Sequence, residues 1–329
     1  MKKIIVFALC LLGAQMAKAQ SNTQTERAIT TGVPFLMIAA DARAAGMGDQ
    51  GVATSADVFS QQWNPAKYAF SLRQHGVAVS YTPYLTEIAN DISLAQINYF
   101  TKLSNERSAF GASIRYFGFG DIELRQNPDD IPVTRSPNEF AVDLTYSLKL
   151  SERFAMAVGG RFISSNLRIP EAAGGASAGA ATSFAFDIAG FYQSEEVAYE
   201  DFNGRWRAGF NFQNMGPKIS YDEDPELSAN FLPANMRLGG GFDFIFDEYN
   251  KIAVNLEIAK LLVPTPPAVV DPVDTNNNGE IDNDEEAAAD QAYADALHDY
   301  EKTGWVSGIF KSFNDAPDGF SEELKEITY

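Results

Sequence analysis

Most of this sequence lacks the residues on which enzymes and nucleic-acid-binding proteins depend. Its only cysteine is Cys10, and its two histidines are His75 and His298. Without cysteine beyond residue 10, the rest of the chain forms no disulfide and uses no thiolate chemistry. Basic residues are also few, because 25 Lys and Arg stand against 44 Asp and Glu, for a formal net charge of −19. A surface of this charge repels phosphates, so we expect no nucleic-acid partner.

Short catalytic motifs are missing as well. The sequence contains no Gly-x-Ser-x-Gly, no His-Glu-x-x-His and no phosphate-binding glycine loop. Residues 239–241 are three glycines inside a strand-like segment, where glycine allows sheet curvature more often than it binds phosphate. We interpret both histidines as solvated or capping residues. The sequence therefore predicts a protein that is not an enzyme.

Residues 1–19 have the features of a secretory signal peptide. Lys2 and Lys3 form the positive region, residues 4–13 the apolar region, and Ala17-Lys18-Ala19 the cleavage site before Gln20. Cleavage there removes three basic residues and no acidic one, so the charge becomes −22. The apolar region is shorter than the ~20 residues that span a bilayer. No later run is long enough either, so a membrane location would require a closed β-barrel.

Alternation of apolar and polar residues dominates the chain from Gly76 onward. In residues 139–150 every second side chain is apolar, from Phe140 to Leu150. A period of two is typical of a strand with one apolar and one polar face. We predict nine strands and the start of a tenth near Lys325; the nine lie near residues 76–84, 92–102, 108–120, 138–150, 153–167, 182–194, 204–213, 235–246 and 250–263.

A soluble β-sandwich also alternates, and the connections favour a membrane barrel over it. Several alternate connections are short and those between them tend to be long, as tight periplasmic turns alternate with external loops in such barrels. The short ones are 103–107, 151–152 and 247–249, and the long ones are 121–137, 168–181, 214–234 and 264–324. The connection 195–203 is longer than this pattern predicts, and 85–91 is shorter. The predicted fold is an all-β, transmembrane antiparallel β-barrel with a periplasmic N-terminus. Charged residues on its inner face are expected to solvate a polar interior: Arg115, Asp143, Arg161, Asp187, Arg205, Arg207 and Glu257.

Residues 20–75 precede the first strand and follow a different pattern. Small residues are interleaved with apolar ones in 32–38 and 41–48. Phe35, Phe59 and Trp63 are large apolar side chains that require burial. We predict a compact plug segment inside the barrel, the alternative being a disordered periplasmic tail.

Two sets of motifs resemble a known family. Asp41-Ala42-Arg43-Ala44-Ala45-Gly46-Met47-Gly48, with Val52-Ala53 and Asn64-Pro65-Ala66, resembles the N-terminal signature of the FadL-like PorV/PorQ group. Residues 305–310 and 315–324 are similar to the PorV family within it, also called LptO. The resemblance covers the chain from about Thr31 and implies a fourteen-stranded barrel with an N-terminal plug. Since a strand only starts at Ile327, we expect the barrel of residues 76–329 to be incomplete at its C-terminus and not to insert stably alone.

The resemblance also implies a function in the type IX secretion system of Bacteroidota. PorV-like proteins lie in outer-membrane lipid, receive cargo bearing a conserved C-terminal domain at the SprA translocon, and deliver it to the PorU-containing attachment complex. The motifs identify no individual cargo-binding residue. A FadL-type transporter of hydrophobic small molecules is the alternative, and a merely structural barrel is a third reading. A transporter requires an apolar tunnel, whereas the charged inner positions favour a polar interior.

The long loop 264–324 contains a calcium-binding pattern. Residues 274–285 fit the twelve-residue Asp-x-Asn-x-Asn-Gly-x5-Glu loop. Gly279 permits the sharp turn, residues 286–300 are predicted to be helical, and prolines in 264–272 exclude an upstream helix. A solvated acidic loop is the alternative. The predicted ligands, through side-chain oxygens and one main-chain carbonyl, are Asp274, Asn276, Asn278, Glu280 (carbonyl), Asp282 and Glu285.

Overall fold

The computed structural model describes residues 27–84, 86, 91–125, 129, 131–167, 180–221, 229–316 and 327–328. The predicted signal peptide and the part of the second motif after Ala316 lie outside these residues. None of the helices in the described ranges is long and apolar enough to cross a membrane.

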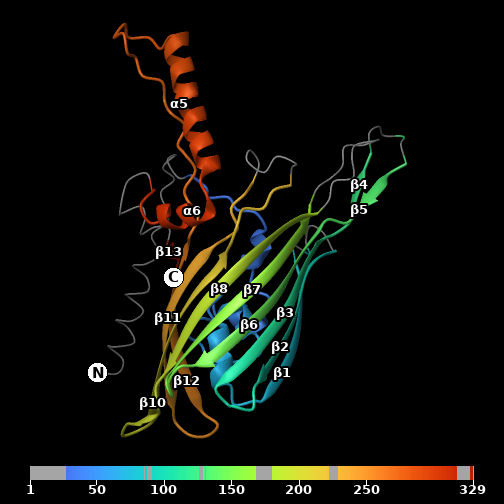
Figure 1. Ribbon diagram of the computed structural model, residues 1–329, viewed down its shortest axis with the longest axis vertical. Helices are drawn as coiled ribbons and strands as arrows, with labels where there is room; N and C mark the ends of the chain where they lie inside the picture. Colours follow the sequence, from blue (N-terminus) through green and yellow to red (C-terminus); the bar gives the residue numbers. More distant parts are fainter. Residues whose placement is uncertain are drawn as a thin grey trace.

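One antiparallel sheet of consecutive hairpins forms most of the molecule, which confirms the predicted all-β class. Its order is β1-β2-β3-β6-β7-β8-β10-β11-β12-β13, and β9 adds to the edge of β10. Figure 1 shows the sheet curving around the N-terminal segment. Over the described ranges β1 pairs with β2 alone, and no pairing closes the sheet into a ring. The strands are β1 (His75–Pro83), β2 (Ile92–Lys102), β3 (Ser108–Phe119), β6 (Asn138–Lys149), β7 (Phe154–Asn166), β8 (Ala181–Gln193), β9 (Val197–Ala198), β10 (Asn203–Met215), β11 (Asn235–Ile245), β12 (Lys251–Leu261) and β13 (Ile327–Thr328).

The nine long strands begin and end within two residues of their predicted bounds. Three short strands were not predicted. They are β9 and the two strands of a separate ribbon, β4 (Ile122–Leu124) and β5 (Val133–Arg135). Strands of two or three residues are too short for a period of two to be recognised. The sheet's up-and-down order places every long connection at one end, where β4, β5 and α5 (Asn283–Lys302) lie in Figure 1.

The two faces of the sheet have the polarity of a membrane barrel and not of a sandwich. Its outer face exposes large apolar side chains, among them Val79, Ile114, Leu144, Phe184, Trp206 and Leu256. Its inner face buries polar and charged ones, among them Gln96, Arg115, Asp143, Arg161, Asp187, Arg207 and Glu257. A sandwich buries its apolar faces between two sheets. The observed inversion suits a wall whose outer face contacts hydrocarbon.

The segment of residues 27–74, which we call the plug, lies within the curve of the sheet. It contains four short helices: η1 (Pro34–Met37), α2 (Ala42–Ala45), α3 (Ser60–Trp63) and η2 (Pro65–Phe70). Phe35, Trp63 and Tyr68 are at most 3% exposed. In Figure 1 the plug is the blue chain visible between the strands.

A charge on the outer face should cost stability according to its depth. Leu144 lies in the middle third of β6, whereas Leu150 lies just past its end, and both are at least half exposed. In the protein purified from outer membranes and reconstituted in phospholipid vesicles, Leu144→Arg is expected to lower the free energy of unfolding by about 2–4 kcal/mol, and Leu150→Arg by about 0–1 kcal/mol. Urea titration followed by tryptophan fluorescence measures both values. Equal costs at the two positions would contradict a lipid-facing wall.

Candidate functional site

The main sheet, from β1 to β13, is called the wall below. It has glycine, which has no side chain, at the points where the plug approaches it most closely. A Cβ atom on Gly209 of β10 would lie 2.3 Å from the carbonyl oxygen of Val52. One on Gly239 of β11 would lie 2.5 Å from Cγ1 of the same valine. Glycine at these positions allows the plug backbone to touch the sheet. The glycine run at 239–241, expected to serve sheet curvature, thus also has a packing function.

Asp41 organises the start of the plug. Its Oδ1 accepts a hydrogen bond of 2.8 Å from the main-chain N–H of Ala44 and so caps α2. Its Oδ2 accepts a second, of 2.8 Å, from the indole Nε1–H of Trp63. Asp41 and Trp63 are each 3% exposed. The first residue of the family-like stretch therefore joins two helices that are distant in sequence.

Side chains of the wall bind the main chain of the plug directly. Glu257 Oε2 accepts hydrogen bonds from the N–H groups of Gly51 and Val52, at 2.8 and 2.9 Å. Such bonds replace water for a backbone that has no strand partner. Further donors point from wall to plug: Arg115 to the oxygen of Leu36 (2.9 Å), Arg207 to that of Ala53 (2.9 Å), Asn211 to that of Trp63 (2.8 Å), Arg237 to that of Asp49 (3.0 Å) and Ser147 to that of Pro65 (2.6 Å).

Lys67 binds the main chain near Gly51 from inside the plug. Its Nζ donates to the carbonyl oxygen of Gly51 at 2.7 Å and to Oγ1 of Thr54 at 3.1 Å. The side chain is fully buried, and desolvation lowers the pKa of Lys67 to about 8. The Gly51 peptide is thus bound on its N–H side by the wall and on its C=O side by the plug.

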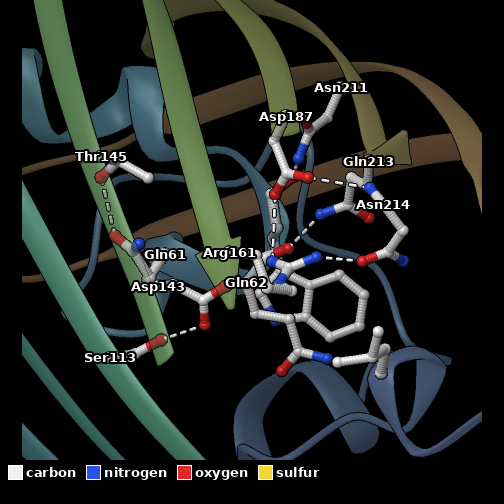
Figure 2. A network of polar contacts seen from close by, with 12 residues as sticks. Gln61, Gln62, Ser113, Asp143, Thr145, Arg161, Asp187, Asn211, Gln213 and Asn214 are labelled. Carbon is white, nitrogen blue, oxygen red and sulfur yellow. Dashed lines mark hydrogen bonds and ion pairs between the residues drawn. The ribbon is translucent and has the colours of Figure 1, made fainter. Parts of the chain in front are cut away.

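A buried ion cluster lies at the centre of the interior (Figure 2). The Arg161 guanidinium donates to Asp143, to Oδ2 of Asp187 at 3.0 Å and to the amide oxygen of Asn214. Ser113 Oγ donates to Asp143 at 2.6 Å, and the main-chain N–H of Asn214 donates to Asp187 at 2.8 Å. These five side chains come from β3, β6, β7, β8 and β10. The cluster therefore connects five consecutive strands across the inside of the wall.

The expectation that the inner charges solvate a polar interior is wrong for six of the seven residues. Those six are at most 7% exposed, and each bonds to another wall residue or to the plug: Arg115, Asp143, Arg161, Asp187, Arg207 and Glu257. Arg205 differs, because it lies near the start of β10, toward the short turns, and pairs with Glu196. The plug fills the space that water was expected to occupy.

Apolar packing fills the interior above and below the ion cluster. Toward the long connections, Phe35 and Leu36 of η1 pack among Leu94, Phe117 and Ile163 of the wall. Toward the short turns, Ala66 and Ala69 of η2 pack against alanines of β7 and β8 and against Phe191. An apolar tunnel of the kind a transporter requires is occupied at both levels by the plug.

The predicted calcium ligands lie in one tight loop and in the first turn of α5, which follows it. Asp274 accepts hydrogen bonds from the main-chain N–H groups of Asn278 (3.2 Å) and Gly279 (2.8 Å). The φ of Gly279 is +86°, in the left-handed region that the pattern assigns to glycine. Asn276 donates to Asp282 at 2.9 Å, and Asn278 accepts from the N–H of Glu280 at 2.7 Å.

Two of these carboxylates already have a structural role. Asp282 and Glu285 form a capping box, so α5 begins at Asn283, three residues before its predicted start. Glu285 also accepts from the N–H of Thr275 at 2.6 Å, and this bond is the main cause that lowers the pKa of Glu285. Within the described part of the chain, no three His, Cys, Asp or Glu residues are grouped so as to hold a metal. Calcium binding stays a prediction.

Sequence reasoning missed the residues that fasten the plug, namely Asp41, Lys67, Asn211 and Arg237. For Asn211 and Arg237 the available signal was the polar face of the strand alternation, which marks an inner residue without naming its partner. Asp41 and Lys67 lie in the plug and belong to no strand.

Removing the central cation should destabilise the wall. Arg161→Met leaves Asp143 and Asp187 buried without their cation, and the free energy of unfolding is expected to fall by about 3–5 kcal/mol. The triple variant Asp143→Asn, Arg161→Met, Asp187→Asn removes the charges together and should recover most of this loss. Urea titration of protein purified from outer membranes and reconstituted in phospholipid vesicles compares the two variants. An equal loss in both variants would show that the charges do not set the stability here.

Calcium binding can be separated from helix capping. Asp274→Asn with Glu285→Gln keeps oxygen acceptors for the main chain but removes two of the charges that bind a hard cation. Millimolar calcium is expected to protect residues 264–316 from proteolysis in the unmodified protein and not in this variant. Asp290→Asn, an exposed change on α5 outside the loop, is the control. Equal cleavage with and without calcium in the unmodified protein would contradict calcium binding. The pattern in residues 274–285 would then belong to an acidic loop that caps α5.

Comparison with known proteins gives one family. The family described as "Type IX secretion system protein PorV" matches residues 20–268. This range contains the plug and strands β1 to β12 but neither α5 nor α6 (Trp305–Lys311). No curated protein matches the chain.

Proposed function

The chain belongs to the PorV family of type IX secretion system proteins, and we propose that it carries protein cargo on its surface without catalysis. As an outer-membrane member of this system it would receive cargo through the cargo's C-terminal domain at a SprA-type translocon. It would then deliver the cargo to a PorU-type attachment complex.

The filled interior is the observation that carries this proposal. Glu257 and Arg207 bind plug main chain at Gly51 and Ala53, and both side chains are buried. Over the described residues, a plug fastened in this way occupies the space along the inner face of the wall. This supports binding of cargo outside the wall, at one of its two ends.

The end with the long connections offers the larger surface. α5 and α6 lie there, and three apolar side chains on or beside α6 are exposed: Val306 at 48%, Phe310 at 74% and Phe313 at 46%. Their spacing of four and three residues places them on one side of the segment. Exposed apolar side chains in a group are typical of a protein-binding surface.

The transporter alternative requires a route along the interior for a hydrophobic molecule. Phe35 and Leu36 of the plug occupy the apolar cluster where such a molecule would enter. Transport would require the plug to leave, and with it the hydrogen bonds between Arg115 and Leu36 and between Glu257 and Val52. The structure supports surface binding over transport for this reason.

Deletion of the gene is expected to trap type IX cargo in the periplasm. A plasmid copy should restore cargo on the cell surface, whereas one with Val306→Asp and Phe310→Asp should restore about tenfold less, as loss of an interface hot spot does. Leu72→Asp, which alters an exposed apolar residue preceding β1, is the matched control. Surface labelling of cargo, with barrel levels measured in parallel, gives the readout. Normal cargo display in the deletion strain would contradict the proposed function.

A further inference from the structure

A groove on the outer face of the wall is separate from both the plug and the long connections. It crosses β2, β3, β6 and β7, has a volume of about 440 Å³, and its lining is almost wholly apolar. Ala112 and Gly160 form its floor, and the larger side chains of Tyr99, Phe110, Leu144 and Tyr146 stand around them.

Strand register explains why the groove exists. Ala112 of β3 pairs with Tyr99 on one side and with Leu144 on the other, and Leu144 pairs with Gly160 of β7. Large and small residues therefore alternate along one row of the outer face. A Cβ on Gly160 would meet nothing within 4 Å, so the space above this glycine is open.

Polar groups close the groove at its short-turn end. Phe110 pairs with Tyr146, whose hydroxyl lies 2.9 Å from Oγ of Ser108. One residue farther, exposed Arg107 donates from Nη2 to the carbonyl oxygen of Lys149 at 3.0 Å. That bond places the guanidinium at the end of the same strand pair, β3 and β6. Along this pair the outer surface thus changes from charged to hydroxylic to apolar.

We propose that this groove binds one glycerophospholipid of the periplasmic leaflet, with an acyl chain over Ala112 and Gly160 and the phosphate at Arg107. The proposal rests on the outer-membrane location, in which the short turns face the periplasm. The groove is continuous with the apolar outer face, so a hydrocarbon chain covers it without exposing any polar group. The guanidinium has five N–H donors, and its bond to Lys149 leaves donors for phosphate oxygens.

Two outward-facing glycines provide a matched test. Gly160→Leu fills the groove, whereas Gly240→Leu makes the same change on the outer face of β11, where the nearest atom to a new Cβ lies 3.9 Å away. The full-length protein is extracted from outer membranes in mild detergent and analysed by native mass spectrometry with phosphatidylethanolamine as the added probe. The unmodified protein and Gly240→Leu are expected to retain a single phospholipid, and Gly160→Leu to lose it.

Arg107→Gln tests the head-group contact independently. Loss of one charged hydrogen bond should weaken retention of the probe about tenfold. Thermal unfolding of each variant verifies that the wall is intact. Equal retention by Gly160→Leu and the unmodified protein would overturn the acyl-chain site, as would a co-purifying polypeptide in place of lipid. Unchanged retention by Arg107→Gln would overturn the phosphate contact.

Discussion

Hydrogen bonding of a main chain that has no strand partner is the constraint on which the rest of this structure depends. The plug is enclosed by a sheet, and each buried peptide group left unpaired costs about 1–3 kcal/mol. Side chains of the wall meet this requirement, as Glu257 does for Gly51 and Val52. Part of the inner face of the wall is therefore polar because it binds the main chain of the plug, and another part because its charged side chains pair with one another.

The same constraint fixes where the protein can act. A plug held by buried hydrogen bonds and by the packing of Phe35 and Leu36 leaves the outer face and the two ends as available surfaces. The outer face is apolar and suits lipid, with a groove between β2 and β7 that fits an acyl chain. The end that carries α5 and α6 exposes Phe310 and its neighbours, and it is there that we propose protein cargo binds.

Much of the fold could be predicted from the sequence because strands with one apolar face repeat every two residues. The bounds of β6 and β7 follow from this period alone. The helix predicted over 286–300 is present as α5, which begins three residues earlier because Asp282 and Glu285 cap it. Interior partners could not be predicted in the same way. Arg161 is recognisable as an inner residue, but its bonds to Asp143 and Asp187 depend on the register of three strands. Asp41 gives a stronger local signal, as a helix N-cap, yet its bond to Trp63 joins residues that only the folded plug brings together.

Hydrogen exchange at the amides of Gly51 and Val52 tests the fastened plug most directly. Both N–H groups donate to Glu257, and neither belongs to a strand or helix. In the protein purified from outer membranes, the account predicts that these amides exchange as slowly as those of β10 and β11, and that Glu257→Gln accelerates them while leaving the strands protected. Exchange within seconds in the unmodified protein would show that the plug leaves the wall, and would contradict a permanently filled interior.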